Sequence, residues 1–208
     1  MVLLFNYIVK FSGWPIWALV ARSKFHYEDK SRQSRKIKGK AIVISNHTSV
    51  WDFAAIMFAF PFRILRCVVA EIMFQKNPLM SFFLRNIGSI RVDRHSPDFA
   101  FIGKATAVLD KGGIVEIYPE SRIPDKKTPE LLPFKPSIAY LALESDTPII
   151  PVYTDGNYFN GPRNHIVVGS PIDVRQLYDE SRSEKENIAA ITEYLRGKIY
   201  ELRDPISQ

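Results

Sequence analysis

The sequence predicts an α/β fold, with a mixed, largely parallel sheet flanked by helices and an N-terminal membrane-facing helix pair. From residue 41 onward, short apolar runs alternate with helical periods, which is typical of chains that build a parallel sheet. Before that point, the first 21 residues contain one charge, Lys10. With 208 residues, 46% of them hydrophobic, the chain can bury one core. We therefore expect a membrane-association segment at residues 1–40 and one globular domain at residues 41–208.

The N-terminal segment, residues 1–21, is long enough to span a bilayer as a helix. A charge at Lys10 is costly in the middle of a span, and Gly13 and Pro15 divide the apolar run. We therefore expect two short helices that lie in the membrane interface. A single span and an apolar helix packed on the core of the domain are the alternatives. In the first short helix, one face would carry Leu4, Tyr7, Ile8 and Phe11.

The net charge of +6 is concentrated near the N-terminus, where residues 1–40 carry +7 and the remaining residues carry −1. A nucleic-acid-binding domain more often carries basic residues across a folded face, so no nucleic acid is expected as a partner. A basic segment beside an apolar helix is attracted to an anionic membrane surface. This bias, and the absence of a signal-peptide pattern, predict a peripheral or monotopic protein on the cytoplasmic face of the cell membrane. The single cysteine, Cys67, excludes an internal disulfide and a cysteine-cluster metal site.

Each element of the globular domain is predicted from its own pattern. Runs of branched apolar residues indicate buried strands, and apolar residues three or four apart indicate helices. In chain order we expect a strand at 41–45, a helix at 51–60, a strand at 64–70, a helix at 78–86, a strand at 89–92, a helix at 100–111, a strand at 114–118, a helix at 137–144, and strands at 148–154 and 165–169. The last helix begins with a capping box from Ser183 to Glu186. Its apolar face contains Ile188, Ile191, Leu195, Ile199 and Leu202.

The first polar cluster runs from Asn46 to Asp52, directly after the first strand of the domain. His47 falls in the turn, and Asp52 lies one helical turn into the following helix, so its carboxylate can fold back toward the imidazole. A carboxylate bonded to one ring nitrogen fixes the tautomer and leaves the other nitrogen as a base. A histidine that caps a helix beside an aspartate is the alternative interpretation.

Two further clusters follow strands. Tyr118 to Arg122 ends the strand at 114–118, where Arg122 could hold a phosphate or occupy an ordinary surface turn. Arg94 closes the segment that begins at Gly88, and a salt bridge with a neighbouring aspartate is its alternative role. No third ligand accompanies the histidine and aspartate pairs, so no metal site is expected.

Together, in this order and spacing, the clusters resemble the glycerolipid acyltransferases of the lysophosphatidic acid acyltransferase type. The resemblance covers residues 40–155. The first block of that family, NHxSxxD, matches Asn46, His47, Ser49 and Asp52. The second block resembles Gly88, Ile90, Val92, Asp93 and Arg94, and the proline-bearing fourth block resembles residues 148–152. The third block, FPEGTR, is similar to Tyr118, Pro119, Glu120, Ser121 and Arg122, but Ser121 stands where the family has glycine and threonine.

The resemblance implies an O-acyltransferase of phospholipid biosynthesis, with an acyltransferase domain at residues 41–208. An acyl thioester, either acyl-coenzyme A or acyl carrier protein, would acylate a lysophospholipid, most simply 1-acyl-glycerol-3-phosphate, to give phosphatidic acid. His47 would be the general base and Asp52 its partner. The acceptor phosphate would be bound by Arg94, Glu120, Ser121 and Arg122, with no cofactor or metal. The alternatives are an acyltransferase or hydrolase with the same dyad that acts on another lysolipid or on glycerol 3-phosphate, and a non-catalytic membrane-surface adaptor.

Overall fold

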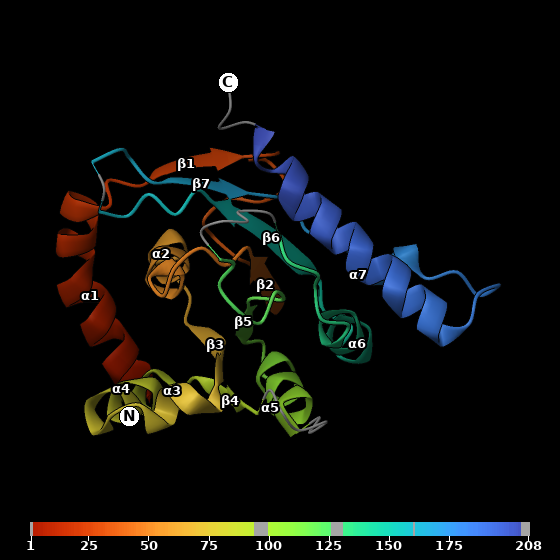
Figure 1. Ribbon diagram of the computed structural model, residues 1–208, viewed down its shortest axis with the longest axis horizontal. Coiled ribbons are helices and arrows are strands. Elements are labelled where there is room, and N and C mark those ends of the chain that lie inside the picture. The colour runs from red at the N-terminus through yellow and green to blue at the C-terminus, as the bar shows by residue number, and fades with distance from the viewer. Residues whose placement is uncertain (1, 94–99, 126–130, 160, 205–208) are drawn as a thin grey trace.

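The structure is a computed structural model that describes residues 2–93, 100–125, 131–159 and 161–204. Within these residues, seven strands form one sheet in the order β1-β7-β6-β2-β5-β3-β4 (Figure 1). The β6–β7 pair is antiparallel and every other neighbouring pair is parallel, which confirms the predicted mixed, largely parallel sheet. The strands are β1 (Lys24–Tyr27), β2 (Ala41–Ser45), β3 (Leu65–Ala70), β4 (Ile90–Val92), β5 (Ile114–Ile117), β6 (Ile149–Thr154) and β7 (His165–Val168).

Helices cover both faces of the sheet (Figure 1). Helices α1 (Val2–Val20) and α2 (Asp52–Ala59) contribute to the core on one face, beside the end of α4 (Pro78–Ile87). Helices α5 (Ala100–Leu109), α6 (Ser137–Glu144) and α7 (Glu184–Glu201) contribute to the core on the other face. Strand β2 is fully buried: Val43 faces the first core, whereas Ile42 and Ile44 face the second. A strand that is buried on both faces has an unbroken run of apolar residues, and this run is the pattern that predicted β2.

Each strand and helix predicted between residues 41 and 204 is present. The capping box at the start of α7 is also confirmed, because Ser183 and Glu186 exchange both hydrogen bonds. Three short elements were missed: β1, helix α3 (Glu71–Gln75) and a 3-10 helix at Val174–Leu177. Strand β1 lies within the segment expected to associate with the membrane, yet it pairs with β7 at the edge of the sheet. Its four residues alternate polar and aromatic side chains, which is a strand pattern at the shortest length that periodicity can detect.

The expected N-terminal helix pair is wrong in one respect: α1 is a single helix that continues through Gly13 and Pro15. Gly13 does not break the helix but lets the ring of Phe58 approach, since an added Cβ would lie 2.9 Å from the Phe58 Cζ atom. Pro15 is exposed and removes one backbone donor, and the helix tolerates that loss. Among the described helices, α1 is the candidate for crossing a membrane by length and composition.

Helix α1 buries Asn6 and Lys10 against the domain and leaves many of its apolar side chains exposed. The Asn6 side chain donates to the carbonyl of Ile87, the last residue of α4, at 2.9 Å. Lys10 Nζ donates to the carbonyls of Phe60, at 2.9 Å, and Arg63, just beyond the end of α2. These side chains satisfy carbonyls that a helix leaves unpaired at its negative end. The exposed side of α1 carries Leu3, Leu4, Tyr7, Ile8, Phe11, Trp14, Ile16, Leu19 and Val20.

This orientation decides between two expectations for the N-terminal segment. The predicted face of Leu4, Tyr7, Ile8 and Phe11 is exposed and is not packed on the core. The core receives Trp17 and Ala21, near the end of the helix. The domain thus leaves a long apolar helix face uncovered.

Candidate active site

The imidazole of His47 and the carboxylate of Asp52 are hydrogen-bonded at the carboxyl end of β2. His47 lies in the loop after the strand, and Asp52 is the first residue of α2. The His47 Nδ1 and Asp52 Oδ2 atoms are 2.7 Å apart. Because a carboxylate accepts, Nδ1 carries the proton and Nε2 keeps its lone pair. The structure therefore brings together the two residues that the first cluster predicted, in a geometry suited to a general base.

Four further donors surround Asp52, whose side chain is fully buried. Its Oδ2 accepts from the backbone N–H groups of Thr48, at 2.6 Å, and Ser49, at 2.8 Å. Its Oδ1 accepts from the hydroxyls of Thr48, at 2.7 Å, and Tyr158, at 2.6 Å. The loop between β2 and α2 thus wraps around the carboxylate and fixes its direction. Tyr158, in the segment after β6, was not identified from the sequence.

The ring of His47 is supported on one side by Tyr118. The two rings are stacked, with centroids 4.6 Å apart and an interplanar angle of 27°. The Tyr118 hydroxyl donates to Glu116 Oε1 at 2.5 Å. Glu116 is buried within β5, and this burial raises the pKa of its carboxyl to about 8. The sequence did offer a signal here, because Glu116 is the one charge in an otherwise apolar strand.

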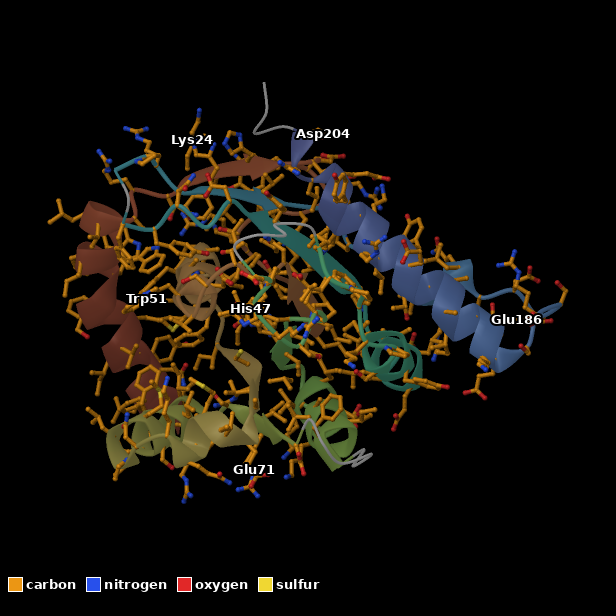
Figure 2. All side chains as sticks on the ribbon, in the orientation of Figure 1. Lys24, His47, Trp51, Glu71, Glu186 and Asp204 are labelled. Carbon is orange, nitrogen blue, oxygen red and sulfur yellow. The ribbon has the colours of Figure 1, made fainter. Side chains whose placement is uncertain are left out.

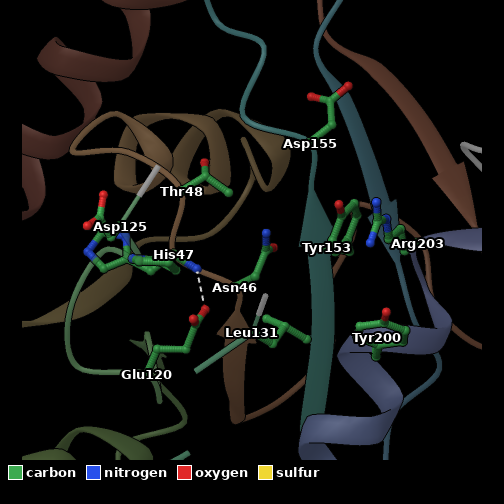
Figure 3. A pocket seen from close by; sticks show the side chains of 11 residues that line it. Asn46, His47, Thr48, Glu120, Asp125, Leu131, Tyr153, Asp155, Tyr200 and Arg203 are labelled. Atoms are coloured by element: carbon green, nitrogen blue, oxygen red, sulfur yellow. Dashed lines mark hydrogen bonds between the residues drawn. The ribbon is translucent and has the colours of Figure 1, made fainter. Parts of the chain in front are cut away.

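Glu120 connects two loops through its carboxylate. Its Oε1 accepts from the backbone N–H of His47, at 2.8 Å (Figure 3). Its Oε2 accepts from the backbone N–H of Leu132, at 2.9 Å. The side chain is buried, and burial raises the pKa of its carboxyl. Glu120 therefore holds the backbone of the loop that carries His47, in keeping with the expectation that it shapes its own loop.

Three other residues were expected to bind the acceptor phosphate: Ser121, Arg122 and Arg94. Ser121 turns the chain with a φ of 62°, a left-handed conformation that is uncommon for a residue other than glycine. This turn lies where the family motif has two residues and this chain has one. Arg122 is exposed and forms no hydrogen bond or ion pair with the residues that the structure describes. Arg94 lies outside the described residues.

A pocket of about 300 Å³ opens beside His47. Its walls come from the loop after β2, from the segment after β5, from the end of β6 and from the end of α7 (Figure 3). It is lined by Asn46, His47, Thr48, Glu120, Pro124, Asp125, Leu131, Tyr153, Asp155, Tyr200 and Arg203. His47 and Glu120 were expected as site residues. Tyr200 and Arg203 are among those that were not, because no local pattern connects the end of α7 with a loop 150 residues earlier.

An aromatic cluster joins the catalytic loop to α1. In Figure 2, His47 lies near the centre of the view and Trp51 lies on the side of α1. The ring of Phe159 contacts both Trp51 and Trp17, with centroid distances of 5.1 and 6.2 Å. Trp51 and Phe159 are about half exposed. The exposed apolar surface of α1 therefore continues to the loop that carries His47.

Comparison with known proteins identifies the family. Residues 22–155 match the family model described as acyltransferase. The chain belongs to this acyltransferase family. The match covers β1 to the end of β6 and includes all three polar clusters, which confirms the resemblance. Tyr158, Tyr200 and Arg203 lie beyond the matched range.

Curated relatives of this acyltransferase-family chain carry the name 1-acyl-sn-glycerol-3-phosphate acyltransferase. The protein from Cocos nucifera is 31% identical over 156 residues, which are 71% of this chain and 49% of that protein. The protein from Bacillus subtilis is 28% identical over 138 residues, 64% of this chain and 66% of that protein. The beta form from Homo sapiens is 26% identical over 167 residues, 79% of this chain and 59% of that protein. The chain thus spans between half and two thirds of the length of these relatives.

A solved structure shares the fold. The crystal structure of the 1-acyl-sn-glycerophosphate (LPA) acyltransferase PlsC from Thermotoga maritima superimposes with a TM-score of 0.67 at 18% identity. The alignment covers 95% of this chain and 79% of that one. It supports the architecture of acyltransferase-family members, including the sheet that positions His47.

Proposed function

We propose that the chain transfers a fatty acyl group from an acyl thioester to the free hydroxyl of 1-acyl-glycerol-3-phosphate, giving phosphatidic acid. The observation that carries the proposal is the 2.7 Å hydrogen bond between His47 Nδ1 and Asp52 Oδ2, which leaves Nε2 as a base beside a pocket. The choice of acceptor and reaction is supported by the family and by the names of the relatives.

In this mechanism His47 Nε2 takes the proton of the acceptor hydroxyl as its oxygen attacks the thioester carbonyl. The tetrahedral intermediate collapses, the carbon–sulfur bond breaks, and the departing thiolate takes the proton back from the imidazolium. Asp52 orients the ring and offsets the positive charge that forms on it. General-base assistance of this kind contributes about 10²–10⁴-fold to the rate. Direct attack by the acceptor needs no acyl-enzyme, and a good thiolate leaving group needs no metal or other cofactor.

The acceptor phosphate would be held by the loop after β5 together with Arg94. Arg122 suits this role because its guanidinium is exposed and can bind a phosphate through two parallel hydrogen bonds. Glu120 and Ser121 would act by shaping the loop, since both Glu120 oxygens are already bonded to backbone N–H groups. The acyl donor would be acyl-coenzyme A or acyl carrier protein.

The exposed face of α1 would place this chemistry at an anionic membrane surface. The acceptor and the product both carry acyl chains, so an enzyme bound to the interface avoids moving them fully into water. Cationic side chains such as Arg22, Lys24, Lys30 and Lys38 follow α1 and would favour anionic lipid. This arrangement describes a peripheral or monotopic enzyme on the cytoplasmic face of the cell membrane.

The test uses the full chain in mixed micelles with lysophosphatidic acid and either long-chain acyl-coenzyme A or acyl carrier protein. Thiol release and phosphatidic acid formation are followed for the wild type, for His47→Ala and for the control His26→Gln, which changes a histidine outside the site. We expect acceptor-dependent release that His47→Ala lowers by at least about 10²-fold. Release without an acceptor would indicate a hydrolase, and no release with either donor and a panel of lysolipids would contradict the proposal.

A further inference from the structure

A second pocket lies at the amino ends of the central strands, whereas His47 lies at their carboxyl ends. It has a volume of about 510 Å³ and is formed by the first turns of α1, the connection from α2 to β3, the end of α5 and the start of β5. Ile114, the first residue of β5, pairs with Ala41, the first residue of β2. His47 follows the other end of β2, so the strand alone separates the two pockets by about 13 Å. This pocket is therefore not part of the candidate active site.

The charged lining of this second pocket is entirely basic. It contains Arg63, Arg66 and Lys111, and none of the lining residues is acidic. Among the residues that the structure describes, no carboxylate forms an ion pair with these three cations. Arg63 and Arg66 are half-buried, so their charges are partly shielded from water. Half-buried cations without a carboxylate partner favour an anion in the space between them.

Both arginines retain unused donors. Arg63 donates from Nη1 to the carbonyl of Ile37, at 3.0 Å, and from Nη2 to that of Gly112, at 2.6 Å. Arg66 donates from Nη1 to the carbonyl of Ile87 at 3.0 Å. A guanidinium has five N–H groups, so three remain on Arg63 and four on Arg66. The backbone bonds hold the two guanidinium groups in place while leaving most of their donors for a ligand.

The other walls of the second pocket are mainly apolar, and one of them is the exposed face of α1. Leu3 and Tyr7 line the pocket and are 60% and 49% exposed. Phe62, across from them in the lining, is 61% exposed. The next residues on the same side of α1, Leu4 and Ile8, extend this apolar surface away from the pocket. A ligand that fits both the basic residues of the pocket and the apolar surface of α1 has an anionic head and an apolar tail.

We infer that the second pocket binds the headgroup of an anionic phospholipid, with its phosphate on Arg66, Arg63 and Lys111 and its acyl chains along α1. The site is separate from the acyl-transfer site and does not rest on the proposed reaction. It gives the protein one specific lipid contact in addition to a diffuse attraction between basic residues and the membrane. The bound lipid would be a neighbour in the bilayer, not a substrate.

The experiment counts lipids retained by the full chain, by native mass spectrometry from a non-ionic detergent. The probes are phosphatidylglycerol, which is neither substrate nor product of the proposed reaction, and zwitterionic phosphatidylcholine. The variants are Arg66→Gln and Lys111→Gln, and Lys104→Gln is the matched control. Lys104 is an exposed lysine within α5, whereas Lys111 lies two residues beyond the end of that helix. His47→Ala tests whether the lipid occupies the other pocket.

We expect one phosphatidylglycerol bound about tenfold more tightly than phosphatidylcholine, and a loss of about tenfold in Arg66→Gln and Lys111→Gln. Lys104→Gln and His47→Ala should bind as the wild type does. Equal binding by the Lys111 and Lys104 variants would overturn the inference, because a diffuse basic surface would then hold the lipid. Loss of binding in His47→Ala, or full displacement by inorganic phosphate, would overturn it as well. Lys111 is exposed, so its variant stays informative even if Arg66→Gln unfolds.

Discussion

The hydroxyl of Tyr158 donates to Asp52 Oδ1 at 2.6 Å, although 106 residues separate the two in sequence. The same hydroxyl is 3.1 Å from that of Thr154, at the end of β6. The ring of Tyr158 lies 5.5 Å from that of Trp17, in α1. Tyr158 thus connects the carboxylate that orients His47 to the helix whose other face is exposed.

Tyr158→Phe tests this connection. The substitution removes one of the two donors to Oδ1 and keeps the ring, so Asp52 retains its bond to His47 but is held less firmly. We expect the unfolding free energy to fall by about 1 kcal/mol and kcat to fall by roughly threefold to tenfold, with KM unchanged. Steady-state kinetics beside Tyr178→Phe, an exposed tyrosine, would check this. An unchanged kcat would show that the other donors suffice to hold the carboxylate.

Glu116→Gln should change how stability depends on pH. The pKa of Glu116 is raised by burial to about 8, from 4.5 in the unfolded chain. Between these values the folded protein keeps a proton that the unfolded chain loses, so this residue makes the unfolding free energy fall as the pH rises. Glutamine carries no charge, so the stability of the variant relative to the wild type should increase by up to roughly 1 kcal/mol per pH unit.

Urea unfolding of both proteins at pH 5, 6.5 and 8 measures this difference. Glutamine still offers an oxygen to the Tyr118 hydroxyl, so the support under His47 is retained. Parallel pH profiles for the two proteins would mean that folding does not raise the pKa of Glu116, which would contradict the prediction.

Lys10→Met should loosen α1 from the domain. The variant keeps the length of the side chain but leaves the carbonyls of Phe60 and Arg63 without their donor. We expect the unfolding free energy to fall by about 1–3 kcal/mol, and hydrogen exchange of residues 2–20 to accelerate. Lys76→Met, at an exposed lysine, is the control and should leave exchange in α1 unchanged.

The double variant Phe11→Ser, Leu19→Ser should weaken membrane binding without affecting the fold. The two side chains are 88% and 80% exposed, so their removal leaves no cavity. Burying an apolar side chain of this size contributes about 1.5–3 kcal/mol, so we expect the affinity for vesicles to fall by more than about tenfold. Vesicle flotation and thermal unfolding measure the two effects. Tyr178→Ser should change neither, and a double variant that still floats with the vesicles would show that α1 is not the membrane-binding surface.

The parts of this fold that were predictable from the sequence are those that local patterns determine. Strand β2 is an apolar run because both of its faces are buried, and the start of α7 is marked by a capping box whose two hydrogen bonds form within four residues. The contact between His47 and Asp52 was predictable for the same reason, because one turn of chain brings the two together.

The parts that were not predictable depend on distant segments. No pattern near Tyr158 or Arg203 shows that they lie beside a loop more than 100 residues earlier. The sequence also does not show which backbone groups Glu120 binds, namely the N–H groups of His47 and Leu132. The orientation of α1 could not be predicted either. Asn6 and Lys10 bind backbone carbonyls in or just after other helices, and every residue has a backbone carbonyl, so the sequence does not mark which ones they bind.

The way in which α1 is held also bears on the order of events during synthesis. The chain is made from its N-terminus, so residues 2–20 leave the ribosome before the carbonyls of Phe60, Arg63 and Ile87 exist. Until then Asn6 and Lys10 have no acceptors in the domain, whereas the apolar side of the helix is already complete. If α1 binds a membrane as proposed, the nascent helix can reach the bilayer first, and the sheet and the loop that carries His47 then fold against it.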